Sequence, residues 1–166
     1  MSPRAAWRLE ALGFEHVADY VGGKADWLAH GLPREGETAH VPYAGELVDR
    51  KPPTCGLTDT IGDVAAQLSG SRYGFCLVIN TRRIVLGRVR KSALQANDAA
   101  TSAESMMEAG PSTVRPNTPA GELVERLKTR ELKTAIITTP DGCLVGIFHR
   151  TDAERQLSPS STTTLG

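Results

Sequence analysis

The 166-residue chain is poor in the features that mark several protein classes. Its three cysteines are widely spaced and form no Cys-x-x-Cys pair, which argues against a disulfide framework and against a zinc site. Basic and acidic residues balance at 19 each, so the excess positive charge typical of nucleic-acid binding is missing. No apolar run approaches the roughly 18 residues of a membrane helix, and the N-terminus lacks a signal peptide. These absences predict a cytoplasmic protein without nucleic-acid or membrane partners.

Motifs for catalysis are equally scarce. The four histidines are isolated and lack metal-ligand spacing, and the sequence contains neither a G-x-S-x-G motif nor a Walker loop. We therefore expect no catalytic residue, no metal site and no enzymatic activity. With 40% hydrophobic residues and 16 glycines, the composition is that of an ordinary globular chain.

A comparison of the sequence with itself reveals an internal repeat. At a constant offset of 59 residues, Gly62 meets Gly121 and Gly87 meets Gly146 without a gap, and apolar positions keep the same phase. One such unit buries too little apolar surface to be stable alone, so we expect the two copies to pack face to face. Further matched pairs are Thr54 with Thr113, Leu68 with Leu127, Leu77 with Ile136 and Val85 with Leu144.

Each copy predicts the order β-α-β-β-α, which makes the fold class α/β, of the α+β kind. Thr60 and Thr118 are the expected N-caps of the first helix in each copy, since threonine accepts a hydrogen bond from the helix start. Runs of β-branched residues separated by turn residues predict the strands. In the second copy the expected elements are a strand at 113–114, a helix to about 129, strands at 134–139 and 143–148, and a helix at 151–157.

The sequence divides into five segments. Residues 54–105 and 106–157 form the two repeats, and the Pro- and Gly-rich stretch 34–53 is predicted to be a linker. Residues 158–166 are of low complexity, which predicts a disordered tail. In residues 1–33 the spacing of apolar residues and the Gly breaks predict a helix ending at Gly13, a short strand at 16–20 and a helix at 24–30.

The repeats resemble a pair of CBS domains. The resemblance rests on the element order, on Met106-Met107, on Ser112-Thr113-Val114-Arg115-Pro116, and above all on the stretch from Leu144 to Asp152. It implies a non-enzymatic regulatory sensor that binds an adenosine-type ligand such as AMP, ADP, ATP or S-adenosylmethionine. It also implies a homodimer formed through the helices. The alternative is a structural dimerisation module without a ligand.

The resemblance also implies a ligand site in the second copy. In this family a Ser or Thr follows the strand and an Asp lies three residues beyond it; here His149 takes the first place and Asp152 the second. A carboxylate at a helix N-terminus stays ionised and can accept hydrogen bonds from both hydroxyls of a ribose. In the first copy Arg90 and Ala93 occupy these places, so we expect at most one nucleotide site. The predicted site residues are Thr113, Val114, Arg115, Gly146, Phe148, His149, Arg150 and Asp152.

Residues 1–33 resemble the C-terminal end of a rhodanese-like sulfurtransferase domain, through Ser2–Leu9, Leu12–Val17 and Gly22–Pro33. Arg4 stands where that family closes its active-site loop, so the persulfide-carrying cysteine would fall before Met1. A truncated sulfurtransferase is thus a second alternative. The apolar residues of this remnant could fold onto the repeats, meet a second chain or stay partly disordered.

Overall fold

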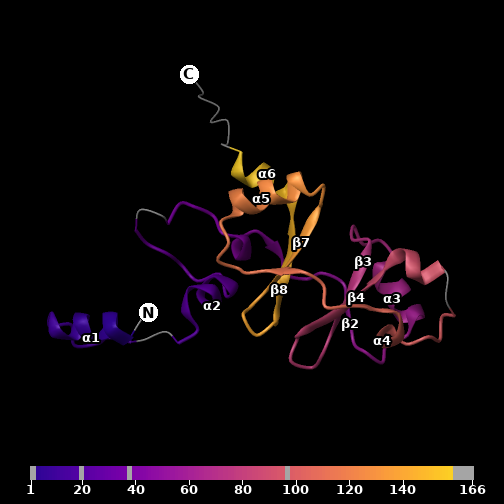
Figure 1. The fold of residues 1–166 in the computed structure, drawn as a ribbon, viewed down its shortest axis with the longest axis horizontal. Helices are drawn as coiled ribbons and strands as arrows, with labels where there is room; N and C mark the ends of the chain where they lie inside the picture. The colour runs from indigo at the N-terminus through magenta and orange to yellow at the C-terminus, as the bar shows by residue number, and fades with distance from the viewer. Residues whose placement is uncertain (1–2, 19–20, 37–38, 96–97, 159–166) are drawn as a thin grey trace, which may run out of the picture.

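The computed structural model describes residues 3–18, 21–36, 39–95 and 98–158. It shows two small α/β units side by side, with the N-terminal helix projecting away from them (Figure 1). This arrangement matches the predicted α+β fold class. The tail predicted at 158–166 lies outside the described residues except for Ser158.

The first repeat contains the predicted elements in the predicted order. They are β2 (Thr54–Cys55), α3 (Ile61–Leu68), β3 (Phe75–Ile79), β4 (Val85–Arg90) and the 3₁₀ helix η2 (Lys91–Gln95). Thr60 caps α3 as expected. Its hydroxyl accepts the Asp63 N–H at 3.2 Å, and the Asp63 carboxylate accepts the Thr60 N–H at 3.0 Å.

The second repeat contains β6 (Thr113–Val114), α5 (Ala120–Thr129), β7 (Thr134–Thr138), β8 (Leu144–His149) and α6 (Arg150–Leu157). One detail of the prediction is wrong, because Pro119 rather than Thr118 is the N-cap of α5. The backbone of Thr118 is committed elsewhere: its N–H donates to Arg115 at 3.2 Å, and its carbonyl accepts the Ala44 N–H at 2.8 Å. Thr118 therefore belongs to the turn before the helix.

The two repeats exchange their edge strands. Strand β1 (Val48–Asp49) precedes the first repeat but pairs with β8 of the second, and β5 (Glu108–Ala109) pairs with β4 of the first. The sheet orders are β1-β8-β7-β6 and β2-β3-β4-β5. Asp49 lies opposite Ile147 and Glu108 opposite Arg88, so this exchange keeps the offset of 59 residues.

The same offset governs the segment before each edge strand. The 3₁₀ helix η1 (Ala44–Glu46) and the helix α4 (Ala103–Met106) occupy matching places. The Ala44 N–H donates to Thr118, and the Ala103 N–H donates to Asp59, both at 2.8 Å. The segment 34–53, which the composition predicts to be a linker, therefore includes secondary structure that packs on the second repeat.

The repeats pack face to face, as predicted. Leu77 on β3 and Ile136 on β7, which are matched by the offset, meet in one buried cluster together with Ile147. The two hairpin turns join by a reciprocal pair of backbone hydrogen bonds, from Val85 to Gly142 at 3.1 Å and from Leu144 to Arg83 at 2.9 Å. Each sheet packs on the helices of its own repeat through a separate core.

The N-terminal segment is only partly attached to the repeats. Helix α2 (Gly23–Ala29) buries Leu28 and Ala29, and the Arg50 guanidinium donates to the Ala29 carbonyl at 2.8 Å. Helix α1 (Pro3–Ala11) leaves Trp7 66% exposed and projects away from both sheets (Figure 1). The strand predicted at 16–20 is not seen in residues 16–18, where no neighbouring strand pairs with the chain; residues 19–20 lie outside the described ranges.

Candidate functional site

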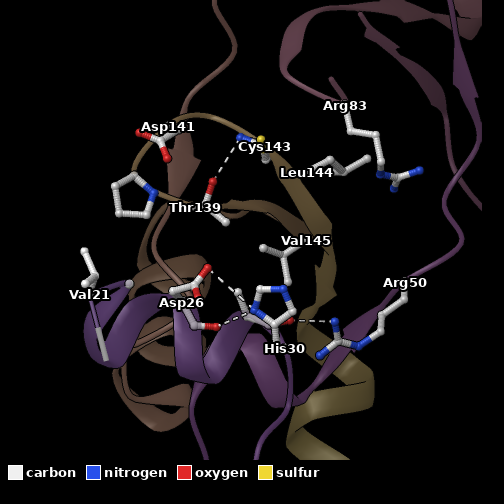
Figure 2. A pocket seen from close by; sticks show the side chains of 13 residues that line it. Val21, Asp26, His30, Arg50, Arg83, Thr139, Asp141, Cys143, Leu144 and Val145 are labelled. Atoms are coloured by element: carbon white, nitrogen blue, oxygen red, sulfur yellow. Dashed lines mark hydrogen bonds and ion pairs between the residues drawn. The ribbon is translucent and has the colours of Figure 1, made fainter. Parts of the chain in front are cut away.

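A cavity of about 830 Å³ lies between α2 and the hairpin turns of both repeats (Figure 2). His30 points into it and is fixed by a 2.9 Å hydrogen bond between its Nδ1 and the Asp26 carbonyl. Arg50 lies beside His30, with its guanidinium bound to the carbonyls of Ala29 and Gly45. None of the predicted site residues lines this cavity, so its size alone does not identify it as their site.

A second cavity, of about 390 Å³, lies where the first repeat meets the second. We call it the Asp152 cleft. The segment before the first repeat supplies one wall, the second repeat supplies the other, and Arg72 reaches in from the loop between α3 and β3. Its lining residues are Glu46, Leu47, Val48, Asp49, Arg72, Ile147, His149, Asp152 and Gln156.

Asp152 lies in the first turn of α6, and both of its carboxylate oxygens are bound by arginines. Arg72 of the first repeat donates to one oxygen at 2.5 Å, and Arg155, one turn further along α6, donates to the other. The hydrogen bond from Arg72 is the main reason why the pKa of Asp152 is lowered. The carboxylate is therefore ionised at neutral pH and acts only as an acceptor.

A second acidic group of the cleft, Asp49, is held by the neighbouring backbone and by Tyr73. The Tyr73 hydroxyl donates to one carboxylate oxygen at 2.7 Å, and the Lys51 N–H donates to the other at 2.9 Å. The Lys51 and Tyr73 bonds lower the pKa of Asp49, whereas burial and then this bond raise the pKa of Tyr73 to about 12. The Arg72 guanidinium lies 5.3 Å from the centre of the Tyr73 ring, which keeps it at the cleft.

His149 completes the polar wall beside Asp152. Its Nδ1 lies 2.9 Å from the hydroxyl of Thr151. Burial, followed by the positive charge of Arg72, lowers the pKa of the imidazole. His149 is therefore neutral at pH 7 and offers one donor and one acceptor nitrogen.

The other predicted site residues lie elsewhere. Phe148 is fully buried in the core of the second repeat, and Gly146 is buried where β1 crosses β8. Thr113, Val114 and Arg115 lie at or just after β6, at the edge of the sheet opposite β1. The Arg115 guanidinium donates to the Thr139 carbonyl, and Arg150 faces Glu154 at 3.8 Å. Of the eight residues, the structure places His149 and Asp152 in the Asp152 cleft.

Sequence reasoning missed Asp49, Arg72 and Tyr73. Asp49 and Arg72 line the cleft, and Tyr73 binds Asp49. These positions depend on the strand exchange and on the packing of one repeat on the other, which are long-range features. The sequence did contain one signal for Asp49. The offset of 59 residues matches it with Glu108, so the repeat includes the segment before Thr54.

The matching region of the first repeat has different chemistry. Ala93 stands in the place of Asp152, and Arg88 and Arg90 both donate to Glu108, at 2.8 and 2.5 Å. Arg90, then Arg88, lower the pKa of Glu108. Arg88 and Arg90 are thus already paired with a carboxylate.

Two kinds of structure are absent from the described residues. No set of three His, Cys, Asp or Glu side chains in the described ranges is arranged to bind a metal ion. No helix in the same ranges has the length and apolar character needed to cross a membrane.

The family model of the CBS domain matches residues 103–158, which cover α4 and the second repeat. No curated protein matches the chain significantly. Among solved structures, the cytosolic domain of the Mg²⁺ channel MgtE in complex with ATP is 19% identical, with a TM-score of 0.62; the match covers 72% of this chain and 51% of that one. The chain therefore spans about half the length of that structure.

Two further similar structures are matched over nearly their whole length. CBSX2 in complex with AMP is 16% identical, with a TM-score of 0.59, over 69% of this chain and 95% of that chain. The CBS domain pair of protein MJ0100, in complex with 5-methylthioadenosine and S-adenosyl-L-methionine, is 13% identical, with a TM-score of 0.56, over 70% and 95%. At these identities the likeness establishes the fold, which is that of a CBS domain pair.

Proposed function

We propose that the protein is a non-enzymatic regulatory module that binds one adenosine nucleotide in the Asp152 cleft. The observation that carries this proposal is the position of the Asp152 carboxylate: it is ionised and lines a cleft where the two repeats meet. A volume of about 390 Å³ lies within the roughly 300–1,000 Å³ of small-molecule sites. Similar folds bind ATP, AMP and S-adenosylmethionine, which supports this class of ligand.

The cleft offers complementary groups for such a ligand. The Asp152 carboxylate can accept hydrogen bonds from both hydroxyls of a ribose, and these bonds are strong because the acceptor is charged. Neutral His149 beside it can donate or accept one more. Leu47 and Val48, which are both partly exposed, supply an apolar surface on which a base can pack.

Ligand binding here would change a contact between the repeats. Arg72 belongs to the first repeat and Asp152 to the second, so a ligand that takes the carboxylate also breaks the ion pair that joins them. This gives binding a direct mechanical consequence, as a sensor requires. The homodimer through the helices and the cytoplasmic location remain predictions.

Isothermal titration calorimetry tests the proposal. AMP, ADP, ATP and S-adenosylmethionine are titrated into the full chain, into Asp152→Asn and into the control Glu122→Gln, an exposed carboxylate in the same repeat. We expect at least one ligand to bind below millimolar concentration. Asp152→Asn should weaken its binding by about tenfold or more, since a charged acceptor is lost, while Glu122→Gln binds like the parent chain.

One observation favours a purely structural module instead. Both oxygens of Asp152 are already bound by arginines, so the carboxylate can serve simply as a bridge between the repeats. In that case no nucleotide binds below millimolar concentration, and Asp152→Asn changes only the stability. An affinity that is equal for Asp152→Asn and the parent chain also contradicts the nucleotide site.

A further inference from the structure

The ion pair between Arg72 and Asp152 has a consequence for the kind of nucleotide that fits the cleft. We infer that Arg72 selects nucleotides that carry a phosphate over the uncharged nucleoside. This inference rests on the proposed function, because it concerns the same cleft. It narrows the ligand class to adenosine phosphates.

A ribose that binds Asp152 must displace the present partners of its carboxylate. Asp152 binds Arg72 through one oxygen and Arg155 through the other, so a ribose diol that takes both oxygens displaces both arginines. The side chain of Arg155 is 76% exposed, so its guanidinium is readily solvated once released. Arg72 is less exposed, at 47%, and its guanidinium rests over the Tyr73 ring at the cleft. The cost of displacement therefore falls mainly on Arg72.

The other carboxylates of the cleft already have hydrogen-bond partners. Asp49 already binds the Tyr73 hydroxyl with one oxygen and the Lys51 N–H with the other. Glu46 is held by Arg34 at 3.0 Å and by the Tyr43 N–H at 2.7 Å. Every carboxylate among the described residues lining the cleft is thus engaged.

The effect of breaking the ion pair depends on the charge of the ligand. A neutral nucleoside breaks the ion pair and leaves Arg72 with only the more distant charge of Asp49, so the lost interaction opposes binding. A phosphate supplies the missing negative charge, and a guanidinium binds phosphate with strong, directional hydrogen bonds. S-adenosylmethionine places a positive sulfonium beside the ribose, where AMP has its phosphate, and its carboxylate lies at the far end of a flexible chain, so it should pair with Arg72 less well than AMP does.

Calorimetry with AMP and adenosine tests this selection, because the two ligands differ only in the phosphate. The parent chain should bind AMP at least about tenfold more tightly than adenosine or S-adenosylmethionine. In Arg72→Met the affinity for AMP should fall and that for adenosine should rise, so that the two differ by about threefold or less. The matched control Arg155→Met removes the other arginine of Asp152 and should keep the preference for AMP.

The outcomes separate this inference from the proposed function. If the parent chain binds no nucleotide, the proposed function fails. If AMP binds but adenosine or S-adenosylmethionine binds as tightly, or if Arg72→Met leaves the ratio of affinities unchanged, the function stands and the selection by Arg72 is wrong. Circular dichroism confirms that each variant folds, and Arg72→Gln replaces Arg72→Met if the latter does not.

Discussion

The regions around the two exchanged edge strands have the same strand register and different side chains. At the offset of 59, Asp49 corresponds to Glu108 and Asp152 to Ala93, and the strand register on either side is identical. The backbone hydrogen bonds that fix this register can be made by almost any residue. The exchange of edge strands can therefore be retained while the polar side chains around the two edge strands become different.

The apolar part of the packing differs as well. Ile147 is fully buried against the other repeat, whereas its counterpart Arg88 is partly exposed and paired with Glu108. Tyr73 is buried and bound to Asp49, whereas its counterpart Leu132 is 47% exposed. Buried, tightly packed side chains therefore lie beneath the Asp152 cleft, whereas the matching region of the first repeat has more exposed ones.

The strongest test of this difference exchanges side chains between the two positions. Ile147→Arg places a charge among buried apolar residues without a partner, and we expect it to lower the free energy of unfolding by about 4 kcal/mol or more. Arg88→Ile removes only a partly exposed ion pair and should change stability by about 1 kcal/mol or less. Urea denaturation followed by circular dichroism measures both values. Similar losses in the two variants would contradict the asymmetry.

The glycines at the strand crossing provide a second test. A Cβ at Gly146 would overlap the backbone carbonyl of Asp49 and lie 2.9 Å from the Val48 Cβ, so β1 would have to move. A Cβ at Gly87 would meet mainly the flexible side chain of Met107, with its sulfur at 2.6 Å. We expect Gly146→Ala to cost about 3 kcal/mol and Gly87→Ala about 1 kcal/mol.

Urea denaturation again gives both numbers, and adenosine nucleotide binding gives a second readout. Because β1 carries Asp49 into the Asp152 cleft, Gly146→Ala should also weaken nucleotide binding, while Gly87→Ala should leave it unchanged. Equal costs for the two substitutions would show that the exchanged strands are equally adaptable.

The sequence was sufficient to predict the repeat, the order of elements within each copy and the face-to-face packing. These depend on periodicity, capping and turn residues, which are local, as at Thr60 and Asp63. The edge strands β1 and β5 were not predicted. They are two residues long, and each pairs with the other repeat, so no local pattern marks them.

For the candidate site, the sequence indicated Asp152 and His149, both near the start of α6. It did not indicate Arg72, because a residue in a loop of the first repeat reaches the cleft only through packing between the repeats. Thr113 and Arg115 were predicted from the family resemblance, yet β6 lies at the far edge of the sheet. The rhodanese-like resemblance of residues 1–33 remains a prediction.

The smallest expected effect on stability comes from the hydrogen bond between Tyr73 and Asp49, which has no counterpart at the matching position Leu132. Tyr73→Phe should cost about 1 kcal/mol at neutral pH, since it removes one buried hydrogen bond. Folding raises the pKa of Tyr73 from 10 to about 12, so the phenol keeps its proton more firmly in the folded chain. The stabilising contribution of protonated Tyr73 to the folded state is complete below pH 10 and is lost as the pH rises through 12. The stability difference between the parent chain and Tyr73→Phe should therefore narrow from pH 10 to 12, as measured by urea denaturation. Leu132→Ala, at the matching exposed position, should show a small cost that does not vary over this range; a pH-independent cost for Tyr73→Phe would mean that folding does not raise the pKa of Tyr73.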